Sequence, residues 1–131
     1  MFEELKEYLK NSYSPYSNFK VSSCLVTKNN KKYFGVNVEN ASYGATICAE
    51  RVAITNAIAR GYKKGDFKEL HVMSNSNKLG VPCFLCRQVM SEFFDKKTKI
   101  IVYSKSHTKS FKMAELCPLP FNEDSLWKVE W

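Results

Sequence analysis

Apolar residues recur with two different periods along the chain. Spacings of three and four residues, as at Phe2, Leu5 and Leu9, place apolar side chains on one face of a helix. This pattern predicts helices over 2–11, 47–60 and about 83–95. Short runs rich in Val, Ile, Leu, Phe and Tyr predict strands over 19–27, 32–38, 70–73, 100–103 and 111–113.

Polar and turn-forming residues separate these segments. The stretch Lys28–Lys31 lies between the first two strands and predicts a β-hairpin. Residues 12–18 and 40–46 are expected to be loops, and residues 115–120 an irregular tail. Because strands then alternate with helices, we expect parallel crossovers and a three-layer α/β/α sandwich whose sheet is covered on both faces.

Length and composition favour one intracellular domain spanning 1–131. The 131 residues suffice for a real core, and 44% of them are hydrophobic, which excludes a disordered chain. No apolar run approaches the roughly 20 residues of a membrane helix. The acidic start, with Glu3 and Glu4, is not that of a secretory signal, so we expect a cytoplasmic protein. Five cysteines, an odd number, are then expected to be free thiols or metal ligands.

The net charge of +7 raises the question of nucleic-acid binding. The lysines are scattered along the chain, and pairs such as Lys63-Lys64 fall where turns are expected. The only arginines, which suit bidentate phosphate recognition better than lysines do, are Arg51, Arg60 and Arg87. We therefore interpret most of the charge as solubility and expect no nucleic-acid partner.

Two short motifs suggest a metal centre. Cys48-Ala49-Glu50-Arg51 and the C-x-x-C segment Pro82–Arg87 each lie where a loop enters a predicted helix. A helix N-terminus carries unpaired N–H groups and partial positive charge, which favour thiolates. Cys48, Cys83 and Cys86 would supply three sulfurs and leave one tetrahedral position of Zn²⁺ open, as in catalytic zinc sites.

An open position on zinc admits a water whose pKa the metal lowers. Glu50, two residues after Cys48, is then the candidate to take and pass on a proton. Arg51 and Arg87 are the candidate cations that offset the charge of the sulfurs.

Simpler interpretations stay open at this point. The C-x-x-C segment also suits a redox pair or half of a structural zinc site. Cys117 could close the site as a fourth ligand, although Cys117, like Cys24, suits a small buried apolar residue better. His71 and His107 lack ligand spacing. Glu50 could merely complement the helix dipole.

Five ordered motifs identify a resemblance over about residues 12–126. They are Tyr13–Val21, Gly35–Gly44, Cys48–Arg51, Pro82–Val89 and Leu116–Phe121. Together they resemble the zinc-dependent cytidine deaminases of the small, homotetrameric type. The resemblance implies a central mixed five-stranded sheet and one Zn²⁺ per subunit, with Cys48, Cys83 and Cys86 as ligands and Glu50 as the proton shuttle between attacking water, ring nitrogen and departing amine.

The resemblance also implies residues that bind a nucleoside. Asn37 and Glu39 look like the pair that hydrogen-bonds the ribose, and Phe19 like the aromatic ring that packs against the base. Without the family match, the same residues would be interpreted as ordinary strand and core positions. The remaining implied roles are backbone contacts to the base edge from Ala49 and Cys83, a thiolate contact from Arg51, and contacts to a neighbouring subunit's site from Tyr43 and Phe121.

Two segments depart from the family pattern. Phe84-Leu85 replaces the small residues usual inside the C-x-x-C, and Ser22-Ser23-Cys24 replaces a Gly-Ala-Ala segment. Both changes add bulk or polarity near the expected pocket or its packing. We therefore expect the metal and proton chemistry to persist, while the substrate range and the exact shape of the pocket stay open at this point.

The function predicted from these residues is hydrolytic deamination of cytidine and deoxycytidine to uridine and deoxyuridine in pyrimidine salvage. The alternatives are a relative acting on a cytosine-based nucleoside antibiotic, a polynucleotide deaminase, and a structural or inactive zinc module. A homotetramer is expected from the resemblance, and the apolar Trp127 and Trp131 of the tail are a further hint of subunit contacts.

Overall fold

A five-stranded sheet with the order β2-β1-β3-β4-β5 forms the centre of the computed structural model, which describes residues 1–126. The parallel pair β3–β4 lies among antiparallel neighbours, so the sheet is mixed. The predicted α/β sandwich with a mixed five-stranded sheet is thus confirmed. The strands are β1 (Val21–Thr27), β2 (Lys32–Val36), β3 (Phe67–Ser74), β4 (Lys99–Tyr103) and β5 (Thr108–Lys112).

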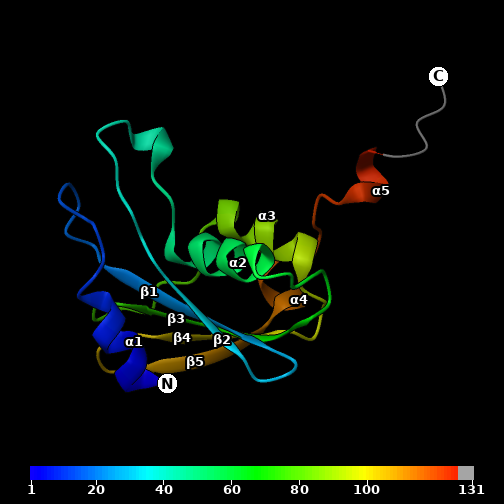
Figure 1. Cartoon of the computed structure of the whole chain (residues 1–131), viewed down its shortest axis with the longest axis horizontal. Helices are drawn as coiled ribbons and strands as arrows, with labels where there is room; N and C mark the ends of the chain where they lie inside the picture. The colour runs from blue at the N-terminus through cyan, green and yellow to red at the C-terminus, as the bar shows by residue number, and fades with distance from the viewer. Residues whose placement is uncertain (127–131) are drawn as a thin grey trace.

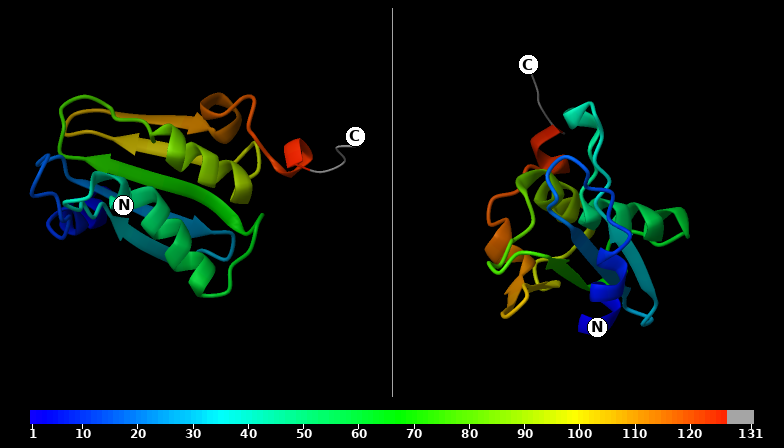
Figure 2. Two further views of the ribbon diagram at one scale, coloured as in Figure 1. Left: turned by 90° about the horizontal axis from the view of Figure 1, so that it is seen from above. Right: turned by 90° about the vertical axis from the view of Figure 1, so that its left-hand side faces the viewer.

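Helices lie on both sides of this sheet (Figure 1). Helix α1 (Phe2–Leu9) packs against β1, β2 and β3 on one face. Helices α2 (Ala49–Ala59) and α3 (Phe84–Phe93) lie next to each other over the opposite face, as the view from above shows (Figure 2). The segment between β2 and α2, which includes the short helix η1 (Tyr43–Ala45), rises beyond α2 at the end where this helix begins (Figure 1).

The C-terminal part differs from the expected irregular tail. A short helix, α4 (Met113–Leu116), follows β5 directly, because Met113 and Leu116 are buried in the main core. A second short helix, α5 (Glu123–Leu126), extends away from the body (Figure 1). Trp127 and Trp131 lie outside the described residues, and the single domain over 1–131 stays a prediction. Between residues 1 and 126, no helix has the length and apolarity to cross a bilayer.

The two faces of the sheet bury separate apolar clusters. Leu70, Ile100 and Met90 belong to the large cluster under α2 and α3, whereas Leu5 and Cys24 belong to the smaller one under α1. The strand alternation explains the division, because successive side chains point to opposite faces.

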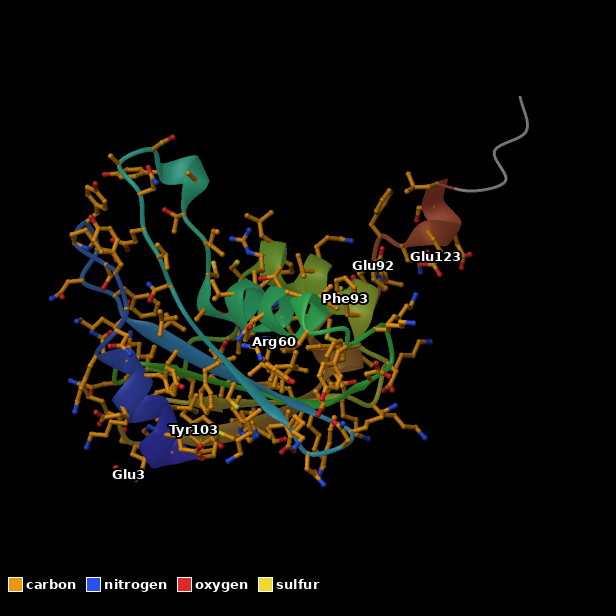
Figure 3. All side chains as sticks on the ribbon, viewed as in Figure 1. Glu3, Arg60, Glu92, Phe93, Tyr103 and Glu123 are labelled. Atoms are coloured by element: carbon orange, nitrogen blue, oxygen red, sulfur yellow. The ribbon has the colours of Figure 1, made fainter. Side chains whose placement is uncertain are left out.

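His71 lies on the α1 side of the sheet, where its function is structural. The ring nitrogens bond to the Tyr103 hydroxyl at 2.8 Å and to a Glu69 carboxylate oxygen at 3.1 Å. The labelled Tyr103 can be followed on that side in Figure 3. His107 is exposed and bonds to its neighbour Ser106. Neither histidine approaches the cysteines that could bind a metal.

Helix α2 begins in close contact with the sheet. A Cβ on Gly35 would lie 2.4 Å from the Ala49 carbonyl oxygen, so glycine is needed at this position of β2. Ser23 pairs with Gly35 across the two strands, and its hydroxyl donates to the same carbonyl at 2.7 Å. Ser22 points to the other face and donates to the Leu5 carbonyl of α1, also at 2.7 Å. The Ser22-Ser23-Cys24 segment therefore bonds and packs helices on both faces instead of reaching the cavity described below.

Candidate metal centre and substrate cavity

Three cysteine sulfurs meet where two helices begin. Cys48 is the N-cap of α2, Cys83 is the N-cap of α3, and Cys86 lies in the first turn of α3. Their sulfur atoms all lie within 4.8 Å of one another. No side chain caps either helix, so free N–H groups and the positive ends of two helix dipoles surround the sulfurs and favour thiolates.

The spacing of the sulfurs suits a zinc ion. Zn–S bonds of about 2.3 Å in a tetrahedron place two sulfurs about 3.8 Å apart. The Cys48 and Cys83 sulfurs are 3.8 Å apart. Thiolates are soft ligands that select zinc over magnesium or calcium, and three of them leave a fourth position for water or substrate.

Arg51 supports negative charge on these sulfurs. Its Nη2 donates to the Cys48 sulfur at 3.5 Å, and its buried Nε has no hydrogen-bond partner among the described residues. A hydrogen bond from Cys86, together with that from Arg51, lowers the pKa of the Cys48 thiol despite its burial. The same contact with Cys48 and burial raise the pKa of the Cys86 thiol, so Cys48 is the first of the two to ionise.

Glu50 is buried beside the sulfurs, with 5% of its surface exposed. Burial raises the pKa of this carboxyl to about 7. A group with a pKa near the working pH can both accept and return a proton, which is the property a general acid–base catalyst requires. The first turn of α2 thus presents Cys48, Glu50 and Arg51 together.

A cavity of about 260 Å³ opens onto Glu50 and two of the sulfurs. Phe19, Asn37 and Glu39 line the cavity at the ends of β1 and β2, so the structure brings the residues implied in base and ribose binding to the same place as the cysteines. The other lining residues are Val21, Thr46, Cys48, Ala49, Glu50, Val72, Ser74, Gly80, Val81 and Cys83.

Asn37 and Glu39 already hold the loop that precedes β1. The Asn37 Oδ1 accepts from Ser12 and from the Val21 N–H, and its Nδ2 donates to the Phe19 carbonyl at 2.8 Å. One amide N–H of Asn37 remains for a ligand. The Glu39 carboxylate accepts from the Ser17 hydroxyl and from backbone N–H groups, and these bonds lower its pKa. Glu39 is therefore an ionised acceptor at the rim of the cavity.

Tyr43 and Phe121 do not reach this cavity. Tyr43 is exposed and packs edge-on against Tyr16, 6.0 Å between ring centres, over a neighbouring hollow. Phe121 is exposed above α3, where its carbonyl accepts from Gln88. Their implied contacts to another subunit's site stay a prediction.

The structure decides three interpretations that the sequence left open. Arg87 donates hydrogen bonds to the carbonyls of Pro82 and Leu116 rather than to a sulfur. Its guanidinium lies over the Phe84 ring, 4.4 Å from the ring centre. Cys117 packs against the main core and lies outside the sulfur cluster, as expected of a small apolar residue, so it closes no four-sulfur site. Phe84 and Leu85 are 77% and 67% exposed and line no part of the cavity, so they do not reshape it.

Other cavity residues escaped the sequence analysis. Val72 and Ser74 come from β3, and Gly80 and Val81 from the loop that leads to Cys83. The available signal was position: Ser74 ends a strand with a parallel neighbour, and ligands bind at the carboxyl ends of such strands.

The part of the chain that carries the site residues also matches known proteins. Residues 1–103 match the family model described as the cytidine and deoxycytidylate deaminase zinc-binding region. A cytidine deaminase of Mycoplasma genitalium is 39% identical over 117 residues, covering 88% of each protein. A probable cytidine deaminase of Dictyostelium discoideum is 41% identical over 120 residues, covering 91% of this chain and 80% of the relative.

A solved structure shows that the likeness extends to the fold. The crystal structure of a cytidine deaminase from Burkholderia pseudomallei matches with a TM-score of 0.87 and 38% identity, covering 91% of this chain and 94% of the other. The family model is a zinc-binding region and the cysteine cluster has the spacing that zinc requires, so the cofactor of the site is zinc.

Proposed function

The chain belongs to the cytidine and deoxycytidylate deaminase family, and we propose that it hydrolyses the C4 amine of cytidine and deoxycytidine. The products are uridine or deoxyuridine and ammonia. One observation carries the proposal: a buried carboxyl and the metal-binding sulfurs share a nucleoside-sized cavity with Asn37, Glu39 and Phe19. A structural zinc module would need neither the cavity nor the buried acid.

The residues divide the work between binding and proton transfer. Glu39 accepts a hydrogen bond from a ribose hydroxyl, and the remaining N–H of Asn37 donates a hydrogen bond to a ribose hydroxyl. The Phe19 ring packs against the base. Backbone groups of Ala49 and Cys83, both lining the cavity, face the base edge. Zinc, when bound, supplies Lewis-acid chemistry that makes water nucleophilic near neutral pH.

Glu50 carries the protons in the proposed reaction. It takes a proton from the water that adds to C4 and delivers a proton to N3 of the ring. It then takes the remaining hydroxyl proton and gives it to the departing amine, so that one water enters and one ammonia leaves. Arg51 stabilises the thiolates throughout, through its bond to Cys48.

The test is ammonia release from cytidine by purified, zinc-loaded protein, followed together with the absorbance change of the base. Cytidine and deoxycytidine are expected to be deaminated. Cytosine without a sugar is expected to react far more slowly, because it cannot form the hydrogen bonds that Asn37 and Glu39 make to the ribose. Folded protein with one zinc per chain and no release from either nucleoside would contradict the proposal.

Ser23 offers a matched pair of variants. Ser22→Ala and Ser23→Ala each remove one hydroxyl that is fully buried and donates to a carbonyl at 2.7 Å, so each is expected to cost about 1 kcal/mol of unfolding free energy. Only Ser23 bonds to the peptide that joins Ala49 to Glu50. We therefore expect Ser23→Ala to lower kcat several-fold and Ser22→Ala to leave it unchanged, with steady-state kinetics and thermal melts as the measurements. Equal kcat values in the two variants would contradict this difference.

We further propose a cytoplasmic homotetramer that acts in pyrimidine salvage. All five cysteines are free thiols, as expected in a reducing compartment. Large apolar side chains lie exposed on η1, at the start of α3 and between α4 and α5, namely Tyr43, Phe84, Leu85, Leu119 and Phe121. Exposed apolar groups of this kind support subunit contacts through these segments.

A further inference from the structure

We propose that Asn75, which lies outside the cavity lining, is the positioning residue that aims the Phe19 ring at the base. The inference rests on the proposed function, because it assigns Phe19 to nucleoside binding. Asn75 directly follows β3 and is 56 positions from Phe19 in the sequence.

Asn75 bonds to the backbone on both sides of Phe19. Its Oδ1 accepts from the Lys20 N–H at 3.1 Å, and its Nδ2 donates to the Asn18 carbonyl at 3.0 Å. Its own backbone N–H donates to the Lys20 carbonyl at 3.1 Å. One residue thus holds the preceding and the following peptide groups of Phe19.

The Phe19 turn needs such support. Asn18 has a φ of 56°, in the left-handed region that asparagine adopts more readily than other non-glycine residues when hydrogen bonds hold it there. The Phe19 ring is 44% exposed, so core packing does not fix its direction. The backbone conformation from Asn18 to Lys20 therefore decides where the ring points.

Two other side chains bond to this turn: one of them lines the cavity and the other bonds to a residue that lines it. Asn37 donates to the Phe19 carbonyl and also lines the cavity. Ser17 accepts from the Phe19 N–H and donates to Glu39. Because a bound nucleoside draws on Asn37 and Glu39, Asn75 is the one of the three whose hold on the turn is independent of substrate.

Asn75 also joins Phe19 to the far wall of the cavity. Its neighbour Ser74, with Val72 two residues earlier, lines the cavity from β3. The bonds from Asn75 therefore set the position of the ring relative to that wall, against which the base must fit.

Loss of the Asn75 hydrogen bonds is expected to weaken nucleoside binding rather than to slow the chemical step. Phe19 packs against the base both in the ground state and in the transition state, in which the tetrahedral change is confined to C4, so its misplacement raises KM and leaves kcat nearly unchanged. We expect Asn75→Ala to raise KM about tenfold, because it removes two side-chain hydrogen bonds. Asn75→Asp keeps the acceptor for the Lys20 N–H but turns a carboxylate oxygen towards the Asn18 carbonyl, so it is expected to raise KM at least as much as Asn75→Ala does.

The experiment is a double-mutant cycle with Phe19→Ala, measuring KM, kcat, zinc content and melting temperature. If Asn75 acts through Phe19, Asn75→Ala raises KM in the wild-type background and adds little in the Phe19→Ala background. Asn56→Ala is the control, since this amide contacts the Phe34 carbonyl at 3.5 Å on another part of the sheet. If Asn75→Ala does not fold, the same cycle is run with Asn75→Asp.

Three results would overturn the inference. The first is an unchanged KM in the Asn75 variant, and the second is an equal rise of KM in both backgrounds. The third is a fall in kcat together with a loss of bound zinc. Wild-type protein that is folded and zinc-loaded but releases no ammonia would instead overturn the proposed function, and this inference with it.

Discussion

Glu50→Gln is expected to bind zinc as the wild type does and to lose nearly all turnover. Glutamine has the shape of glutamate, but its amide neither takes a proton from water nor delivers one to the ring or the amine. Loss of a positioned acid–base group typically costs about 10² to 10⁴ in rate. Two proton relays, each with a transfer to Glu50 and a transfer from it, depend on this residue, so we expect a loss at the upper end of that range.

The fold is expected to tolerate this substitution. Glu50 is buried, and burial raises the pKa of its carboxyl to about 7, so the folded protein already favours a neutral side chain at this position. A neutral amide therefore adds no desolvation cost. We expect the melting temperature of Glu50→Gln to equal or exceed that of the wild type near neutral pH.

The measurements are ammonia release, zinc content and a thermal melt, with Glu92→Gln as the matched control. Glu92 is an exposed glutamate on α3 and contacts none of the sulfurs. The control is expected to keep full activity. Wild-type turnover by Glu50→Gln would remove the proton-shuttle role, and loss of zinc from that variant would mean that Glu50 supports the metal instead.

The sequence predicted the metal centre more completely than the cavity. Cys48, Cys83 and Cys86 are placed by short-range rules, because each lies at the start of a helix whose apolar period is visible in the sequence. The C-x-x-C spacing also explains why Phe84 and Leu85 do not line the cavity. Residues three apart share a helix face, so the two residues between the ligands point elsewhere.

The cavity depends on contacts that no local pattern encodes. Asn75 bonds to Asn18 and Lys20 across more than fifty residues, and only the pairing of β1 with β3 brings them together. Strand alternation predicts that Ser22 and Ser23 face opposite sides of the sheet, but which side carries α2 is decided by the fold. Arg87 is likewise a candidate cation for the sulfurs in the sequence, whereas in the fold it bonds to the carbonyls of Pro82 and Leu116.

Cys83→Ala is expected to lose both zinc and activity. Two sulfurs of the cluster would remain, so the metal would have to bind with one ligand fewer. Cys83 is exposed at the N-cap of α3, where alanine is tolerated at a cost of about 1 kcal/mol or less. The chain is therefore expected to fold while binding no stoichiometric zinc.

Cys117→Ala is the matched control, because Cys117 is a half-buried thiol that lies outside the sulfur cluster. Metal analysis of dialysed protein is expected to give one zinc per chain for the wild type and for Cys117→Ala, and close to none for Cys83→Ala. Added zinc should raise the melting temperature of the first two proteins and not of the third, since a ligand stabilises only a fold that binds it. Full zinc content in Cys83→Ala would show that Cys83 is not a ligand, whereas zinc loss from Cys117→Ala would restore the four-sulfur site that the geometry argues against.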